Sequence, residues 1–139
     1  MKKIVFLVGL LLFAASTTAQ AEELKVVPGS RCIECGMICM VDSPFTSAMV
    51  DRSGKYSWFC DIGDLFIYQK NGGKGSVQSQ KYVRDFKNNG RLKVENAFFV
   101  KSKSMKSPMG WGIAAFNSEK DAAEHGKVLS AKEIMGLLP

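Results

Sequence analysis

The chain has 139 residues, of which 46% are hydrophobic and 23% charged, and its formal net charge is +6 at pH 7. This composition supports a buried core, so it excludes a disordered or collagen-like chain and indicates one compact domain or two very small ones. Only one apolar run approaches the length that a bilayer requires, which excludes a multi-span membrane protein.

That apolar run predicts an export signal over residues 1–21. Lys2 and Lys3 form a positive start, residues 4–15 are apolar, and residues 19–21 (Ala-Gln-Ala) offer the small-x-small pattern that signal peptidases cut. No cysteine stands at the cleavage point to carry a lipid. We therefore expect a soluble periplasmic protein after cleavage, which contacts the membrane only if the signal stays uncleaved.

The mature chain is expected to begin with a polar arm and a Cys/Met cluster over residues 22–40, with little core in the arm. Residues 41–90 form a first strand-strand-helix-strand unit. Strands are predicted over 45–51 and 56–60 around the turn at 52–55, and Asp61 caps a helix that ends at residues 71–73 (Asn-Gly-Gly). A short strand over 82–86 completes the unit.

Residues 91–139 repeat this plan as a second unit with a C-terminal helix. The expected elements are a strand over 92–100, a loop over 101–110, a strand over 111–116, a helix capped by Ser118, and a strand-like pair at 128–129. Ser130 and Glu133 fit a capping box for the last helix. The Phe-Cys-Asp junction at 59–61 and the Phe-Asn-Ser junction at 116–118 lie 57 residues apart, which indicates an internal duplication and an α+β class.

The cysteines carry the most information about function. Three of them, Cys32, Cys35 and Cys39, fall within eight residues, and the fourth, Cys60, stands alone. A structural disulfide framework is one interpretation, a closed zinc tetrathiolate is a second, and an iron–sulfur cluster fits less well because its usual spacings differ. The neighbouring thioethers of Met37 and Met40 favour Cu(I), which selects thiolate and thioether donors.

Other side chains have two interpretations each. Met105 and Met109 lie in a polar loop where burial does not explain a thioether, whereas Met49 and Met135 read as core residues. Cys60 lies at a helix start, where it is either a ligand or reactive thiolate, or a half-buried apolar residue. His125 ends a helix or binds metal.

The sequence offers little for catalysis or nucleic acids. A thioredoxin-like oxidoreductase places its Cys-x-x-Cys after a strand, and here the pair follows a polar arm. A single histidine and the lack of a Gly-x-Ser-x-Gly motif leave no nucleophile and base for hydrolysis. Lysines 101, 103 and 106 lie among serines, not aromatics, so we expect neither an enzyme nor a nucleic-acid partner.

Three blocks of the sequence resemble the NosL family of periplasmic copper(I) chaperones for nitrous oxide reductase. The first is residues 32–37 (Cys-Ile-Glu-Cys-Gly-Met). The second runs from residues 83–86 (Val-Arg-Asp-Phe) to 97–100 (Ala-Phe-Phe-Val), and the third from 108–110 (Pro-Met-Gly) to 125–126 (His-Gly). Together they span nearly the whole mature chain, which makes the resemblance specific.

The resemblance implies duplicated units distantly like organomercurial lyase, and a Cu(I) site. Cys35, Met37 and Met109 match the family motifs, Cys32 matches a cysteine that is often lipid-bearing, and Cys60 is an additional sulfur. The implied function is delivery of Cu(I) to nitrous oxide reductase or a similar copper enzyme. The alternative is an exported zinc or thiol-redox protein that uses Cys32 and Cys35. A disulfide between these two would block copper uptake, so we expect a need for a reductant or a periplasmic thiol reductase.

Overall fold

Two antiparallel sheets organise the chain in the computed structural model, which describes residues 22–139. The predicted signal at 1–21 lies outside these residues. In chain order the elements are β1 (Ser47–Val50), β2 (Tyr56–Phe59), α1 (Ile62–Lys70), β3 (Gln80–Arg84), β4 (Arg91–Lys93), the 3-10 helix η1 (Val94–Asn96), β5 (Phe98–Lys101), β6 (Ile113–Phe116), α2 (Glu119–Ala123) and α3 (Ala131–Leu137). None of the helices described in 22–139 is long and apolar enough to cross a membrane.

The first sheet has the strand order β2-β1-β3-β4, with antiparallel neighbours throughout. The predicted hairpin is confirmed, because β1 and β2 pair from Ser47 opposite Phe59 to Val50 opposite Tyr56. Asp51 closes the turn, since its carboxylate accepts from the Ser53 and Lys55 backbone N–H groups. Asp61 caps α1 as expected by accepting from the Gly63 N–H.

The second sheet repeats the topology with fewer residues. β5 pairs with β6, and Leu129 bonds to Phe99 of β5 through both backbone groups, at 2.8 and 2.9 Å. In the first unit β1 lies between β2 and β3, and in the second unit β5 lies in the same way between β6 and Leu129. Ser118 caps α2, and the Ser130–Glu133 capping box of α3 is present. The α+β class and the duplicated order of elements are thus confirmed.

The prediction of one strand over residues 92–100 is wrong. The 3-10 turn η1 separates β4 from β5, and the two strands belong to different sheets. Glu95 and Asn96 have low strand propensity and lie exposed in this turn. β4 pairs with β3, so the first sheet extends past the predicted unit boundary at residue 90. The division into units 41–90 and 91–139 stays a prediction.

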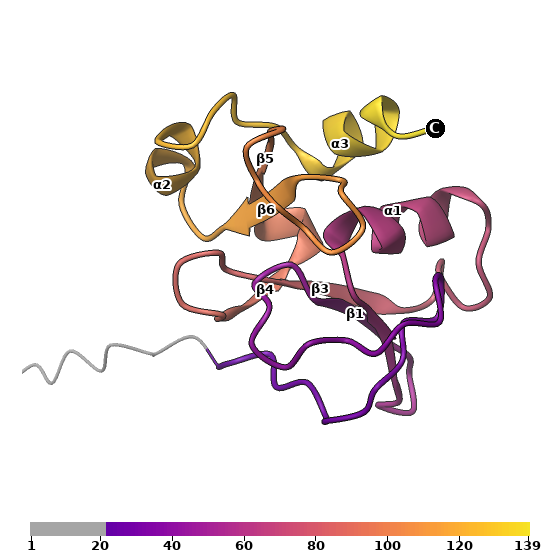
Figure 1. Cartoon of the computed structure of the whole chain (residues 1–139). Helices are drawn as coiled ribbons and strands as arrows, with labels where there is room; N and C mark the ends of the chain where they lie inside the picture. The colour runs from indigo at the N-terminus through magenta and orange to yellow at the C-terminus, as the bar shows by residue number, and fades with distance from the viewer. Residues whose placement is uncertain (1–21) are drawn as a thin grey trace, which may run out of the picture.

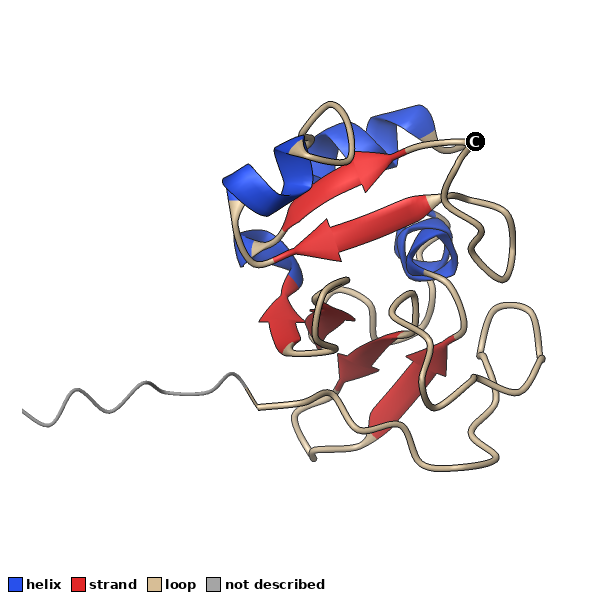
Figure 2. Ribbon diagram, turned by 60° about the vertical axis from the view of Figure 1, so that its left-hand side comes forward, coloured by secondary structure: helices blue, strands red, loops and turns tan. Residues whose placement is uncertain are grey.

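Figure 1 shows the two sheets as separate layers, with β5 and β6 above β1 and β3, and Figure 2 shows the same separation from another side. The end of β3 joins them, because the Phe86 N–H donates to the Ala115 carbonyl of β6 at 2.8 Å. Helix α1 contacts β1, β2 and β6, so it packs against both sheets. A single main core of buried side chains runs from the N-terminal arm through both sheets to α3.

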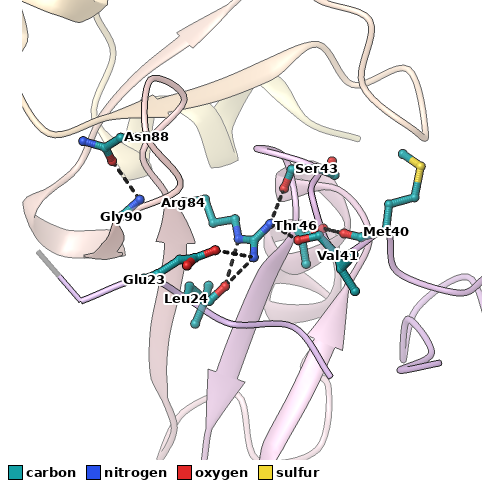
Figure 3. Close-up of polar contacts among 9 residues, drawn as sticks. All are labelled: Glu23, Leu24, Met40, Val41, Ser43, Thr46, Arg84, Asn88 and Gly90. Carbon is teal, nitrogen blue, oxygen red and sulfur yellow. Dashed lines mark hydrogen bonds and ion pairs between the residues drawn. The ribbon is translucent and has the colours of Figure 1, made fainter. Parts of the chain in front are cut away.

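The N-terminal arm contributes to that core, which corrects the expectation that little core forms there. Leu24 and Val26 are buried among the residues of the main core. Arg84, at the end of β3, is itself buried and donates from Nε to the Leu24 carbonyl at 2.9 Å and from Nη1 to the Val41 and Ser43 carbonyls at 2.6 and 3.0 Å (Figure 3). One guanidinium thus fixes both ends of the segment that carries three of the four cysteines.

Candidate metal centre

Three thiols and one carboxylate converge between the arm and the start of α1. The sulfur atoms of Cys32, Cys35 and Cys60 and an oxygen of Asp64 all lie within 4.8 Å of one another. The Cys35 and Cys60 sulfurs are 3.2 Å apart, and Asp64 Oδ2 accepts from the Cys60 and Cys32 thiols at 3.3 and 3.5 Å. A group of soft donors at this separation is suited to a thiophilic metal ion.

A tight turn in the arm aims Cys32 and Cys35 at this point. The Cys32 N–H donates to the Met37 carbonyl and the Gly36 N–H to the Cys32 carbonyl, at 2.8 and 2.9 Å. Gly36 has φ +76°, which a glycine adopts without strain. The Ile33 N–H then donates to the Trp58 carbonyl of β2 at 2.9 Å, and this bond docks the turn on the first sheet.

The junction of β2 and α1 supplies the other two groups. Cys60 directly follows β2 and precedes the N-cap Asp61, and Asp64 lies in the first turn of α1. The thiol and the carboxylate meet across the cap, where Cys60 Sγ lies 3.3 Å from Asp64 Oδ2. Between them, Asp61 caps the helix through Oδ1. Burial raises the pKa of the Asp61 carboxyl.

The Pro-Met-Gly loop between β5 and β6 covers the start of α1. The Met109 N–H donates to Asp61 Oδ2 at 3.0 Å, and the Trp111 indole N–H donates to Asp64 Oδ1 at 2.9 Å. The Trp111 ring lies against Gly63, where any β-carbon would overlap it. The second unit thus reaches the cluster through two carboxylates of the first.

The cluster is closed on one side and open on the other. Cys32, Cys60 and Asp64 are buried, whereas Cys35 is half-buried. The Met37 and Met109 residues remain 45% and 41% exposed. Cys35 is therefore the sulfur of the cluster that solvent reaches most readily, and both methionine side chains are also accessible.

Burial controls the ionisation of the thiols. It raises the pKa of the Cys32 thiol above its usual value of 9.0. It also raises the pKa of Cys60, and the side-chain hydrogen bonds with Cys35 and Asp64 act in the same direction. The stabilisation of a Cys60 thiolate by the start of α1 is therefore outweighed, and both groups are neutral thiols at pH 7.

Several predicted candidates lie elsewhere among the described residues. Cys39 is buried and is not among the four converging groups, although it lies close enough for Cys32, Cys35 and Asp64 to act together with burial in raising its pKa to about 12. The described residues therefore do not bring all four cysteines into one group. Met105 packs against the second, smaller core cluster. The His125 ring stacks on Phe116, with 5.0 Å between centroids, which is a packing role.

Sequence reasoning missed Asp64 and Trp111. The position of Asp64 in the first turn after the predicted cap at Asp61 was an available signal, because it brings a carboxylate close to the residue that precedes the cap. The partnership of Asp64 with Trp111 spans 47 residues and has no local signal. The predicted site residues Cys32, Cys35 and Cys60 meet, and the Met109 backbone lies beside them.

Gly63→Ala tests whether the seat of Trp111 matters. The new methyl group would overlap the indole, so we expect the ring to move and the free energy of unfolding to fall by about 1–3 kcal/mol, as for other overpacked sites. Urea denaturation measures the loss, and the Trp111 indole N–H signal in an NMR spectrum reports the movement.

Gly136→Ala in α3 is the matched control, because its β-carbon would meet nothing within 4 Å. This change is expected to be neutral or to stabilise by up to about 1 kcal/mol, since alanine is the better helix former. An unmoved Trp111 signal together with equal stability in both variants would contradict the packing described.

The fold and the cluster together define a small α+β protein of duplicated units with a sulfur-rich cluster that could hold a metal ion. The family model described as NosL matches residues 23–136, so the chain belongs to the NosL family. Its fold is similar to that of the copper chaperone NosL from Shewanella denitrificans, with a TM-score of 0.66, 21% identity, and coverage of 82% of this chain and 96% of that chain. No curated protein matches the sequence significantly.

Proposed function

We propose that this protein is a periplasmic Cu(I) chaperone. It carries copper on Cys35, with Cys32, Cys60, Met37 and Met109 as the remaining donors, and delivers the ion without converting a substrate. The observation that supports this most is the convergence of three sulfur atoms within 4.8 Å of one another at a partly open position. Thiolates and thioethers are the donors that Cu(I) selects in proteins.

The open side supports transfer. A carrier must release its ion to an acceptor, which is easiest when an incoming ligand can bind before the carrier's own ligands leave. Cys35 and Met109 meet this need because both are accessible, while Cys32 and Cys60 lie below the surface. The acceptor is a copper enzyme, and nitrous oxide reductase is the candidate that membership of the NosL family suggests. The proposed export signal at 1–21 supports a periplasmic location.

A Cu(I) titration of the reduced protein tests the ligand set. Met109→Leu removes one thioether at nearly constant volume, and we expect the affinity to fall by at least about 10–100-fold, the range that loss of a group supporting the ligands already produces. Competition with a chromophoric Cu(I) chelator gives the affinity. Met105→Leu, a second thioether in the same loop, should leave it unchanged, and equal behaviour of the two variants would remove Met109 from the site.

The affinity is also expected to rise with pH. Cys32 and Cys60 are protonated at neutral pH because burial raises their pKa values, and each loses its proton when it binds metal. The apparent affinity should therefore increase up to about tenfold per pH unit for each thiol proton that the metal displaces, across roughly pH 6 to 8. The chelator competition repeated over this range measures the slope.

Cys60→Ala should lower this slope by about one proton if Cys60 is a ligand. Cys39→Ala should not change it, because Cys39 lies outside the cluster. A pH-independent affinity in the unmodified protein would show that metal binding does not displace protons from these thiols.

Zinc binding is the second candidate, and Asp64 is the observation that favours it. A carboxylate oxygen beside three sulfurs would complete a four-coordinate site for Zn(II). Isothermal titration of the reduced protein with Zn(II), followed by Cu(I) challenge, separates the two functions. Displacement of zinc by stoichiometric Cu(I) supports the chaperone, and retention of zinc supports the alternative.

A further inference from the structure

The cysteine in close sulfur contact with Cys35 is Cys60, which lies outside the Cys-x-x-Cys motif. The Cys35 sulfur lies 3.2 Å from the Cys60 sulfur. The Cys32 sulfur is engaged differently, since it donates to Asp64 Oδ2 at 3.5 Å and accepts from the Cys35 backbone N–H at 3.4 Å. All three sulfurs lie within 4.8 Å of one another, and those of Cys35 and Cys60 are in close contact.

The fold holds Cys35 and Cys60 at this separation. The turn that carries Cys35 is bonded to β2 through Ile33 and Trp58, and Cys60 lies two residues after Trp58. Cys60 then leads directly into the capped start of α1. Both cysteines therefore lie in segments that are attached to β2, which keeps their sulfur atoms close together. To form an S–S bond of about 2.0 Å, the two sulfurs need to approach each other by only about 1 Å more.

We propose that Cys35 and Cys60 are a thiol–disulfide exchange site, at which a dithiol/disulfide protein oxidises and reduces this chain. Cys35 is the cysteine that reacts with the partner, because it is half-buried while Cys32 and Cys60 are buried. The inference rests on the proposed function in one respect: the disulfide would remove two copper donors at once and so close the site to Cu(I).

Oxidation of this chain takes two thiol–disulfide exchange steps. The Cys35 thiolate attacks one sulfur of the partner's disulfide, and the other partner sulfur leaves as a thiolate. Cys60, after losing its proton, then attacks the Cys35 sulfur of the mixed disulfide and releases the second partner thiolate. Two cysteines are oxidised, one partner disulfide is reduced to a dithiol, and the two protons pass to the partner's sulfurs. Reduction is the same path in reverse.

Disulfide mapping tests the pairing without copper. The purified protein is equilibrated with glutathione disulfide, free thiols are alkylated in acid, and the chain is cut with trypsin and a glutamate-specific protease. Cleavage after Glu34 separates Cys32 from Cys35, so the fragments are 32–34, 35–52 and 56–70. We expect the last two to be joined, and fragmentation in the mass spectrometer to place the bond on Cys35.

Cys39→Ala is the matched control, because it removes the second cysteine of fragment 35–52 from outside the cluster. The joined fragments should persist in this variant, and in Cys60→Ala glutathione should remain on Cys35. Joining of 32–34 to 35–52, or full alkylation of all four cysteines, would overturn the proposal. A Cu(I) titration of the reduced and oxidised forms is read separately: if the reduced form binds no copper, the proposed function fails while the disulfide result stands.

Discussion

Replacement of Cys35 by alanine is expected to lower the affinity for Cu(I) by more than about 100-fold, beyond the loss caused by an outer-shell change. Cys35 is the thiol that faces both solvent and the buried sulfurs, with Cys60 at 3.2 Å. Without it, an incoming ion would have to reach two buried thiols directly. Chelator competition on the reduced protein measures the loss.

Cys39→Ala provides the comparison for this experiment. This change also removes one thiol from the segment that carries Cys35, but the thiol is buried and is not one of the four converging groups. Its affinity should match that of the unmodified chain once unfolding curves show that it is folded. If the two variants bound Cu(I) equally well, the cluster could not be the copper site.

Arg84→Met is expected to cost several kcal/mol of stability, roughly 3 kcal/mol or more, because unpaired buried acceptors cost about 1–3 kcal/mol each. Methionine fills most of the volume, but it leaves the carbonyls of Leu24, Val41 and Ser43 without their donor, and each lost bond to a charged group is worth about 1.5–3 kcal/mol. The arm should also loosen, with faster amide exchange over 22–43. Urea denaturation and hydrogen exchange measure the two effects.

Arg91→Met serves as the control for Arg84. Arg91 also pairs with an arm residue, Glu22, but that carboxylate is 72% exposed and the pair lies at the surface. Such pairs contribute at most about 1 kcal/mol. Similar losses in both variants would mean that the buried guanidinium does not fix the arm.

Elements set by local chemistry could be predicted from the sequence. The turn at 52–55 and the caps at Asp61, Ser118 and Ser130 depend on neighbouring residues, and the structure contains all of them. The break at Val94–Asn96 could not be predicted in this way. Glu95 and Asn96 interrupt the apolar pattern there, but the change of sheet depends on tertiary pairing, since β4 pairs with β3 and β5 with β6.

Some residues of the candidate site could also be predicted from local sequence, and others could not. The thiols of Cys32 and Cys35 stand out by their spacing, and Cys60 by being the remaining cysteine. Asp64 and Trp111 do not, because a carboxylate in a helix and an aromatic residue in a loop are common, and their bond depends on how two distant units pack. The burial of the arm was missed because Arg84, 60 residues away from Leu24, determines it.

The two oxygens of Asp61 bear on how copper could leave. One caps α1 and the other holds the Met109 backbone, so swinging the Pro-Met-Gly loop outward would strip a donor from a buried carboxylate, at about 1–3 kcal/mol. A lid-like handover is therefore disfavoured. An acceptor that approached Cys35 with the loop in place would leave this hydrogen bond unbroken.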